Sequence, residues 1–188
     1  MGLRWNVKDD KVGFGYKPEL SDSRLTKREI LRKSAKIYDP LGLLSPATIR
    51  SKLFLQDSWS RKLTWDQKIP SEIRTEWLNI DDDLNKCSIV SFPRRFFNQN
   101  TNSGEKPNLH VFTDASKSAY GACAYLVKGT ESTFVMAKNH VAPLKQLTIP
   151  QLELMGALIG GRLASHILSS LQTVEKCILW SDSQIVLH

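Results

Sequence analysis

Cysteine is scarce in this sequence, with three residues in a chain of 188. Cys87, Cys123 and Cys177 lack the close spacing of zinc ligands, and their odd number does not suit a framework of disulfides. Reduced and mostly buried thiols in an intracellular compartment are the simplest interpretation. This usage excludes the class of small, disulfide-stabilised secreted domains.

Long apolar runs are also lacking. No segment approaches the roughly 20 apolar residues that cross a membrane as a helix, and no signal-peptide pattern opens the chain. We therefore expect no membrane partner. The hydrophobic share of 41% and the charged share of 24% are typical of globular protein, and 188 residues suffice for one large domain or two small ones.

Negative charge is scarce in one segment. Between Arg24 and Lys62, ten Lys and Arg residues face only three acids, so this segment carries the whole net charge of +7. A capping box at 26–29 predicts one helix, and Ser45 with a following proline predicts the cap of a second. Basic side chains on the outer faces of these helices are candidates for binding phosphate. The alternative is an ordinary solvated helix face. The candidate binding residues are Lys27, Arg28, Arg32, Lys33, Lys36, Arg50 and Lys52.

The middle of the chain predicts a connection between two parts. The alternating residues 3–7 and 12–16 predict a hairpin with one buried face, and a helix is expected after Pro70. Three consecutive acids at 81–83 would diverge in direction, so we expect a solvated turn there. Residues 98–107 contain no core-forming side chain and predict the domain boundary.

The second half opens with a strand that carries an acid. Residues 109–116 alternate so that Phe112 and Asp114 point to one side. Two more strands are expected at 123–127 and 133–137, joined by a hairpin turn over 128–131.

A helix with an acid near its start follows these strands. Residues 148–151 form its beginning, where Pro150 occupies a first-turn position that needs no N–H donor. The stripe that begins at Glu153 continues only with small residues. Its further members are Gly156, Ala157, Gly160 and Ala164. We therefore expect the helix backbone to approach a sheet closely, with Glu153 projecting at its N-terminal end.

Another apolar strand, residues 177–181, leads to Asp182. A strand, a helix and a strand predict parallel neighbours with a right-handed connection, so Asp114 and Asp182 should share one sheet edge, beside Glu153. Three converging carboxylates repel one another without a cation, and hard oxygen ligands suit Mg²⁺ or Mn²⁺. A pair of such ions can activate water for phosphodiester cleavage. The alternative is three ordinary surface acids.

These motifs resemble a known family. The segments FTDAS at 112–116, LELMGAL at 152–158 and WSDSQ at 180–184 look like the first three acidic motifs of ribonuclease H. With KREI at 27–30 and AKIYDPLGLLSP at 35–46, the chain resembles the pol polyprotein of BEL/Pao-type LTR retrotransposons. The same segment is also grouped under the name of the Pao retrotransposon peptidase.

The resemblance implies an α/β fold: a small helical thumb and connection region at 1–97, a linker at 98–107, and an incomplete ribonuclease H-like mixed sheet with a crossover helix at 108–188. It implies metal-dependent endonuclease cleavage of RNA in RNA–DNA hybrids, with Asp114, Glu153 and Asp182 as catalytic and metal-binding residues and two Mg²⁺ or Mn²⁺ ions as cofactors. The implied partners are an RNA–DNA hybrid or template–primer and the remainder of the polyprotein, in a cytoplasmic particle or the nucleus.

Two expected parts are lacking. The Tyr/Phe-x-Asp-Asp turn of a polymerase is absent, so DNA synthesis is unsupported. The fourth carboxylate of the family pattern is also absent, because the chain stops six residues after Asp182, and we expect a C-terminally truncated ribonuclease H-like domain.

Two other functions are alternatives to a nuclease. One is a non-catalytic, nucleic-acid-binding remnant of a retroelement, so enzymatic activity is not settled by the sequence. The other is an aspartic peptidase, which requires two Asp-Thr/Ser-Gly loops that share a proton. The segments after Asp114 and Asp182 lack the glycine, so peptidase chemistry has no support in the residues.

Overall fold

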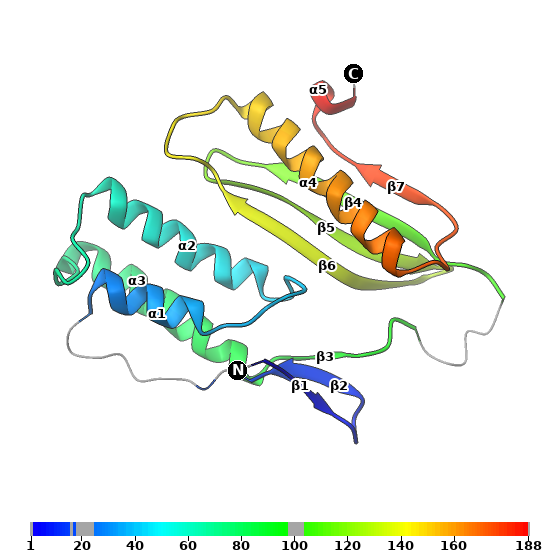
Figure 1. The fold of residues 1–188 in the computed structure, drawn as a ribbon, viewed down its shortest axis with the longest axis horizontal. Helices are drawn as coiled ribbons and strands as arrows, with labels where there is room; N and C mark the ends of the chain where they lie inside the picture. Colours follow the sequence, from blue (N-terminus) through cyan, green and yellow to red (C-terminus); the bar gives the residue numbers. More distant parts are fainter. Residues whose placement is uncertain (1, 16, 18–24, 98–103, 188) are drawn as a thin grey trace. The chain divides into compact units, whose positions relative to one another are not determined.

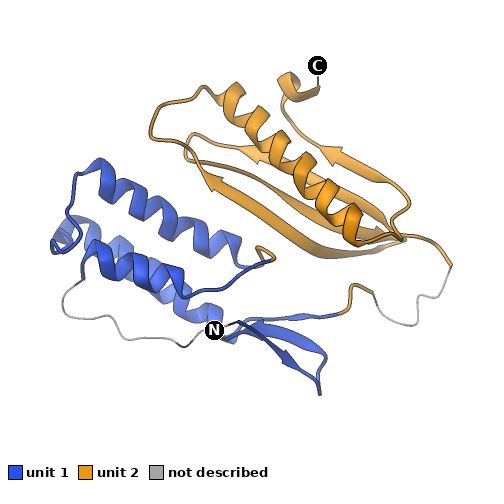
Figure 2. Cartoon of the chain, viewed as in Figure 1, with its two compact units in different colours: residues 1–40, 44–94 blue, residues 41–43, 95–188 orange. Residues whose placement is uncertain are grey.

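The computed structural model describes residues 2–15, 17, 25–97 and 104–187. The chain forms two compact units, residues 1–40 with 44–94 and residues 41–43 with 95–188 (Figure 2). Of the linker predicted at 98–107, residues 98–103 lie outside the described part. The first unit combines helices with a small sheet, and the second has a larger mixed sheet, which is the α/β class expected from the sequence.

The first unit contains three helices, α1 (Lys27–Ala35), α2 (Ser45–Ser60) and α3 (Ser71–Lys86), and a 3₁₀ turn follows at Cys87–Ile89 (Figure 1). The Thr26 side chain accepts a hydrogen bond from the Glu29 backbone N–H at 3.3 Å, as its capping role predicts. Ser45 is not a cap. Leu44 holds that position, and its N–H donates to the Asp39 carboxylate at 2.7 Å.

A small antiparallel sheet completes the first unit, with strands β1 (Leu3–Asn6), β2 (Lys11–Phe14) and β3 (Ser91–Pro93) in the order β1-β2-β3. The predicted hairpin is present as β1 and β2. Its predicted buried face is wrong for β1, because all four residues of that strand are exposed.

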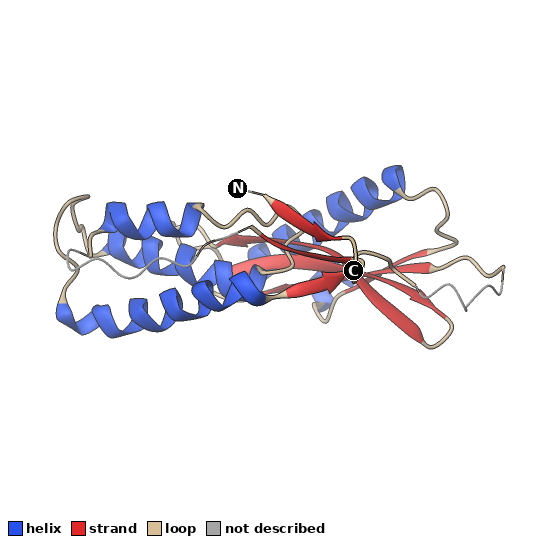
Figure 3. Ribbon diagram, turned by 90° about the horizontal axis from the view of Figure 1, so that it is seen from below, coloured by secondary structure: helices blue, strands red, loops and turns tan. Residues whose placement is uncertain are grey.

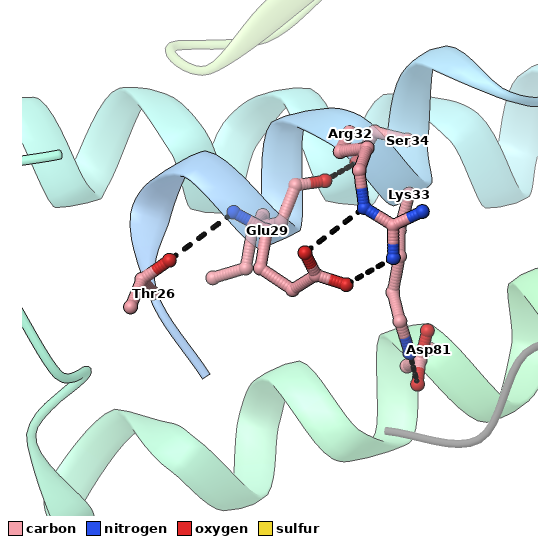
Figure 4. A network of polar contacts seen from close by, with 7 residues as sticks. Thr26, Glu29, Arg32, Lys33, Ser34 and Asp81 are labelled. Carbon is pink, nitrogen blue, oxygen red and sulfur yellow. Dashed lines mark hydrogen bonds and ion pairs between the residues drawn. The ribbon is translucent and has the colours of Figure 1, made fainter. Parts of the chain in front are cut away.

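A buried ion pair joins α1 to α3 (Figure 4). The Lys33 ammonium lies 2.7 Å from an Asp81 carboxylate oxygen, and these side chains are only 1% and 6% exposed. A charge in such a position requires an opposite partner, because unpaired burial costs several kcal/mol. The expected solvated turn at 81–83 is therefore wrong: the three acids lie within α3, and Asp82 and Asp83 form ion pairs with Lys86 and Arg50.

The second unit is built on a four-stranded mixed sheet in the order β6-β5-β4-β7. The strands are β4 (Asn108–Ala115), β5 (Ala119–Lys128), β6 (Glu131–Val141) and β7 (Cys177–Trp180). β4 pairs antiparallel with β5 and parallel with β7, so the parallel neighbours expected from the sequence are confirmed. β5 and β6 are longer than expected, and Gly129 at φ 57° turns the chain between them.

Helix α4 (Ile149–Ser170) contacts β4 and β5 through its small-residue stripe, and the short α5 (Gln184–Leu187) follows β7 (Figures 1 and 3). A Cβ built on Gly160 would lie 2.3 Å from the Thr113 methyl, and one on Gly156 would lie 3.1 Å from the Asp114 carbonyl oxygen. The absence of side chains at these two positions thus sets the helix-to-sheet distance.

The opposite face of the sheet carries stacked aromatic rings. Phe112 lies 6.0 Å from Trp180 with nearly parallel planes, and Trp180 stacks on His110 at 5.9 Å. Trp180 also donates its indole N–H to His110 Nδ1 at 3.0 Å. Tyr125 and Phe134 continue the row across β5 and β6. None of the described helices is long and apolar enough to cross a membrane.

We predict that Gly160→Ala destabilises the second unit. The added methyl would overlap Thr113, whose hydroxyl is engaged with the Trp180 carbonyl at 3.2 Å. Overpacking costs about 1–3 kcal/mol and should exceed the gain in helix propensity of about 1 kcal/mol. Gly161→Ala is the matched control, because nothing lies within 4 Å of its Cβ position, and it should raise the melting temperature. Equal changes of melting temperature in the two variants would contradict the close approach of α4 to β4.

We also predict that Lys33→Ala strongly destabilises the helical unit, by about 3–5 kcal/mol, because it leaves the Asp81 charge buried and unpaired. The double variant Lys33→Met with Asp81→Leu should recover much of this loss, since it removes both charges. Lys86→Ala, which breaks an exposed ion pair on the same helix α3, should change stability little. Chemical denaturation measures all three, and a tolerated Lys33→Ala would contradict a structural role for this pair.

Candidate active site and nucleic-acid interface

The β4–β7 pairing brings two of the expected acids to one edge of the sheet. Phe112 pairs with Trp180 in parallel register. Asp114 and Asp182 each follow this last pair by two residues, Asp114 within β4 and Asp182 in the segment after β7. Both side chains are exposed.

The third acid reaches this edge from helix α4. Thr148 and Gln151 form a complete capping box that fixes the start of the helix, with Pro150 in the first turn as the sequence predicts. Glu153 follows in the next turn. One turn after Glu153, Gly156 lies against the Asp114 carbonyl, so the close approach of helix and strand sets how near Glu153 comes to β4.

A hydrogen bond connects this helix to the segment after β7. The Ser183 hydroxyl donates to a Glu153 carboxylate oxygen, and Ser183 is buried although both of its neighbours are exposed. Ser183 was not among the candidate residues, although it stands directly after Asp182 in the quoted motif. Its hydrogen bond to Glu153 connects the third acidic motif to the second.

The three carboxylates belong to the same end of the sheet but do not form a complete metal site. The Asp114 carboxylate accepts a hydrogen bond from the adjacent Ala115 N–H at 2.7 Å. Within residues 2–15, 17, 25–97 and 104–187, no group of three or more His, Cys, Asp or Glu side chains is close enough to hold a metal ion. The donor chemistry nevertheless fits a hard divalent cation, because all three groups offer carboxylate oxygens.

The thiols of this chain do not behave as reactive groups. Burial raises the pKa of Cys87, Cys123 and Cys177 above the ordinary thiol value. These cysteines therefore remain protonated near neutral pH and are unsuited to act as nucleophiles.

The basic segment of the first unit is only partly available to a ligand. We expected the lysines of α1 to face outward, and for two of them this is wrong, because Lys27 and Lys33 are 3% and 1% exposed. Lys33 is held by Asp81, and Lys27 donates to the Leu63 carbonyl at 3.0 Å. Alternation of charged and apolar residues along a helix cannot reveal a lysine that turns inward toward a distant partner.

The other candidate cations lie at or near the surface. Arg28, Arg50 and Lys52 are exposed, Arg32 is exposed and contacts Glu29, and Lys36 is half-buried. Arg28 forms a two-pronged contact with Asp66 at 2.7 and 3.0 Å. The hydrogen bond to Arg28 lowers the pKa of Asp66, and the same bond raises the pKa of Arg28, so both groups are charged over the physiological range.

The comparisons with known proteins agree with the motifs. The model of the family described as "Pao retrotransposon-like RNaseH-like domain" matches residues 26–183, from the cap of α1 to the residue after Asp182. No curated protein matched the chain.

Two solved structures show weak likeness. One is a foamy viral protease-reverse transcriptase in complex with dsDNA, at 16% identity and TM-score 0.39, covering 85% of this chain and 34% of that one. The other is the foamy viral protease-reverse transcriptase dRH in complex with ds DNA, at 18% identity and TM-score 0.40, covering 85% and 29%. The chain thus spans about a third of the length of these proteins, and such TM-scores decide neither fold nor ligand. The family match covers most of the sequence, and the chain belongs to the Pao retrotransposon-like RNaseH-like domain family.

Proposed function

We propose that this chain is a ribonuclease H-type nuclease part of a retroelement polyprotein, which cleaves the RNA strand of an RNA–DNA hybrid. The observation that carries the proposal is the position of the three acids: Asp114 next to the last residue of β4, Asp182 two residues after the end of β7, and Glu153 near the start of α4. The family match supports the same class of activity. A peptidase remains without support, because neither Asp114 nor Asp182 stands in the Asp-Thr/Ser-Gly sequence that an aspartic peptidase requires.

Each acid would contribute differently to the reaction. Asp114 stands on the inner strand β4 and is paired with Gly121 of β5, so its backbone is held within the sheet. Glu153 is oriented by the Ser183 hydroxyl, which occupies one of its oxygens and leaves the other available. Asp182 follows the short edge strand and is exposed, so it is accessible to an approaching phosphate backbone.

These carboxylates would hold Mg²⁺ or Mn²⁺. Such ions, when bound, supply an activated water and a counter-charge for the leaving oxygen. The contribution of the chain is to supply the three oxygen donors from β4, from the start of α4 and from the segment after β7, and to orient Glu153 through the Ser183 hydroxyl.

The helical unit would hold the nucleic acid through its exposed cations. Exposed ion pairs such as Arg28–Asp66 contribute little to stability, so a phosphate can replace the carboxylate at little cost. The buried Lys27 and Lys33 take no part in this contact. Phosphate contacts of this kind position a duplex and do not read its sequence.

The catalytic proposal predicts that Asp114→Asn abolishes magnesium-dependent cleavage of a hybrid labelled on its RNA strand, while hybrid affinity changes less than about twofold, because binding and chemistry use different residues. Glu131→Gln is the matched control. It removes one carboxylate at the β5–β6 hairpin, at the opposite end of the sheet, and should cleave normally. Titration with Mn²⁺ followed by calorimetry gives a second readout, in which only Asp114→Asn should lose metal binding.

If the unsubstituted chain binds the hybrid but shows no cleavage with Mg²⁺ or Mn²⁺, the function is the non-catalytic one. The chain would then be a nucleic-acid-binding remnant.

The binding proposal predicts a change in salt dependence. Arg28→Gln with Arg32→Gln should weaken hybrid binding and reduce the slope of log affinity against log salt by about one unit per lost phosphate contact. Lys106→Gln with Lys176→Gln removes the same charge from exposed positions of the second unit and is the control. Equal slopes for the two variants would show that binding follows total charge rather than this surface.

A further inference from the structure

Two half-exposed tryptophans stand together on the helical unit, one at the end of α2 and one in the loop before α3. Trp59 and Trp65 are 52% and 40% exposed, and their ring centroids lie 6.3 Å apart in an edge-to-face arrangement. Rings kept at the surface in a fixed arrangement are typical of contact sites for a partner.

The buried Lys27 side chain contacts both rings and fixes their position. Its ammonium lies 5.1 Å from the Trp59 centroid and 5.2 Å from the Trp65 centroid, and it donates to the Leu63 carbonyl. Because Lys27 is 3% exposed, these contacts are shielded from water and correspondingly strong. Because Lys27 is buried, it cannot bind phosphate as the sequence predicted. It instead holds the two tryptophans in place.

The loop that carries Trp65 is also held firmly. The Arg28 N–H donates to the Trp65 carbonyl at 3.1 Å, and a β-bridge joins Thr26 to Lys68. The Arg28 guanidinium lies 6.0 Å from the centre of the Trp65 ring. A partner would therefore meet a surface that is already ordered, so little conformational entropy is lost on binding.

The charge around the rings favours nucleic acid. The nearby acids Asp57 and Asp66 are each engaged by an arginine, Arg61 and Arg28. Lys62, between the two tryptophans in the sequence, and Lys68, three residues after Trp65, are exposed and form no ion pair within the described residues, so positive charge remains in this segment. Aromatic faces bordered by unpaired cations match a ligand with flat bases on a phosphate backbone.

We propose that Trp59 and Trp65 form a stacking site for an unpaired nucleic-acid strand, with Lys62 and Lys68 on its phosphates. The inference deepens the proposed nucleic-acid function and rests on it. An unpaired strand is specified because only unpaired bases present a free π-face, whereas the bases of a duplex are already stacked on one another. The site would hold a single-stranded extension of a template or of a hybrid.

The test compares a labelled single-stranded oligothymidine with a blunt RNA–DNA hybrid on the full chain. Trp59→Ala and Trp65→Ala should each reduce oligothymidine affinity by about tenfold without changing the salt slope, because stacking involves no counterion release. Lys62→Gln with Lys68→Gln should instead reduce that slope, by about 0.7 per lost contact. Trp5→Ala is the control: Trp5 is 56% exposed and lies 5.1 Å from the Arg94 guanidinium, and this variant should bind normally.

Substitution by alanine also removes the packing of Lys27, so a second readout is needed. Trp59→Phe with Trp65→Phe keeps a ring over the ammonium. In the unsubstituted chain, oligothymidine should quench tryptophan emission, and most of this quenching should vanish in the Phe variant. Unchanged quenching in the Phe variant, or unchanged oligothymidine affinity in the two Ala variants, would overturn the stacking site.

The remaining outcomes separate this inference from the proposed function. If the chain binds the hybrid but not oligothymidine, the stacking site is wrong and the hybrid-binding function stands. If it binds neither, the proposed nucleic-acid function itself fails. If polyglutamate binds in a tryptophan-dependent way and oligothymidine does not, the partner is an acidic protein segment and the inference is overturned.

Discussion

The near-contact of α4 with the central strand is the constraint on which the candidate site depends. Gly156 and Gly160 have no side chain where the helix comes closest to the sheet, and a Cβ at Gly160 would overlap the Thr113 methyl. The same packing carries the first turns of α4 to the end of β4, where Asp114 lies. A catalytic function would thus be sensitive to substitutions that never touch a substrate.

The first unit is organised by charges that point inward. Lys33 joins α1 to α3 through Asp81, and Lys27 joins α1 to the end of α2 and to the loop before α3 through the rings of Trp59 and Trp65. In each case a lysine that looks like part of a basic surface instead fixes one element against another. The positive charge left for a ligand is smaller than the net charge of the segment suggests.

The sequence predicted most of what depends on local pattern. The cap at Thr26, the start of α4 and the parallel pairing of β4 with β7 follow from capping residues, a first-turn proline and the strand–helix–strand order. The inward lysines and the burial of Asp81 could not be predicted, because each depends on a partner 32 to 48 residues away in the chain. The exposed side chains of β1 show the same limit, since alternation indicates a face and cannot show what covers it.

The two strand pairings of β4 differ greatly in extent. β4 pairs with β5 over eight residues and with β7 over four, and β7 becomes a neighbour of β4 only after the whole of α4. Hydrogen-bonded segments with few partners open more readily than the body of a sheet. The edge that carries Asp182 can therefore separate from β4 while β4, β5 and β6 stay folded. Such an opening would move Asp182 away from Asp114 and release the Ser183 contact with Glu153, so the spacing of the three acids would depend on a local folding equilibrium of this strand.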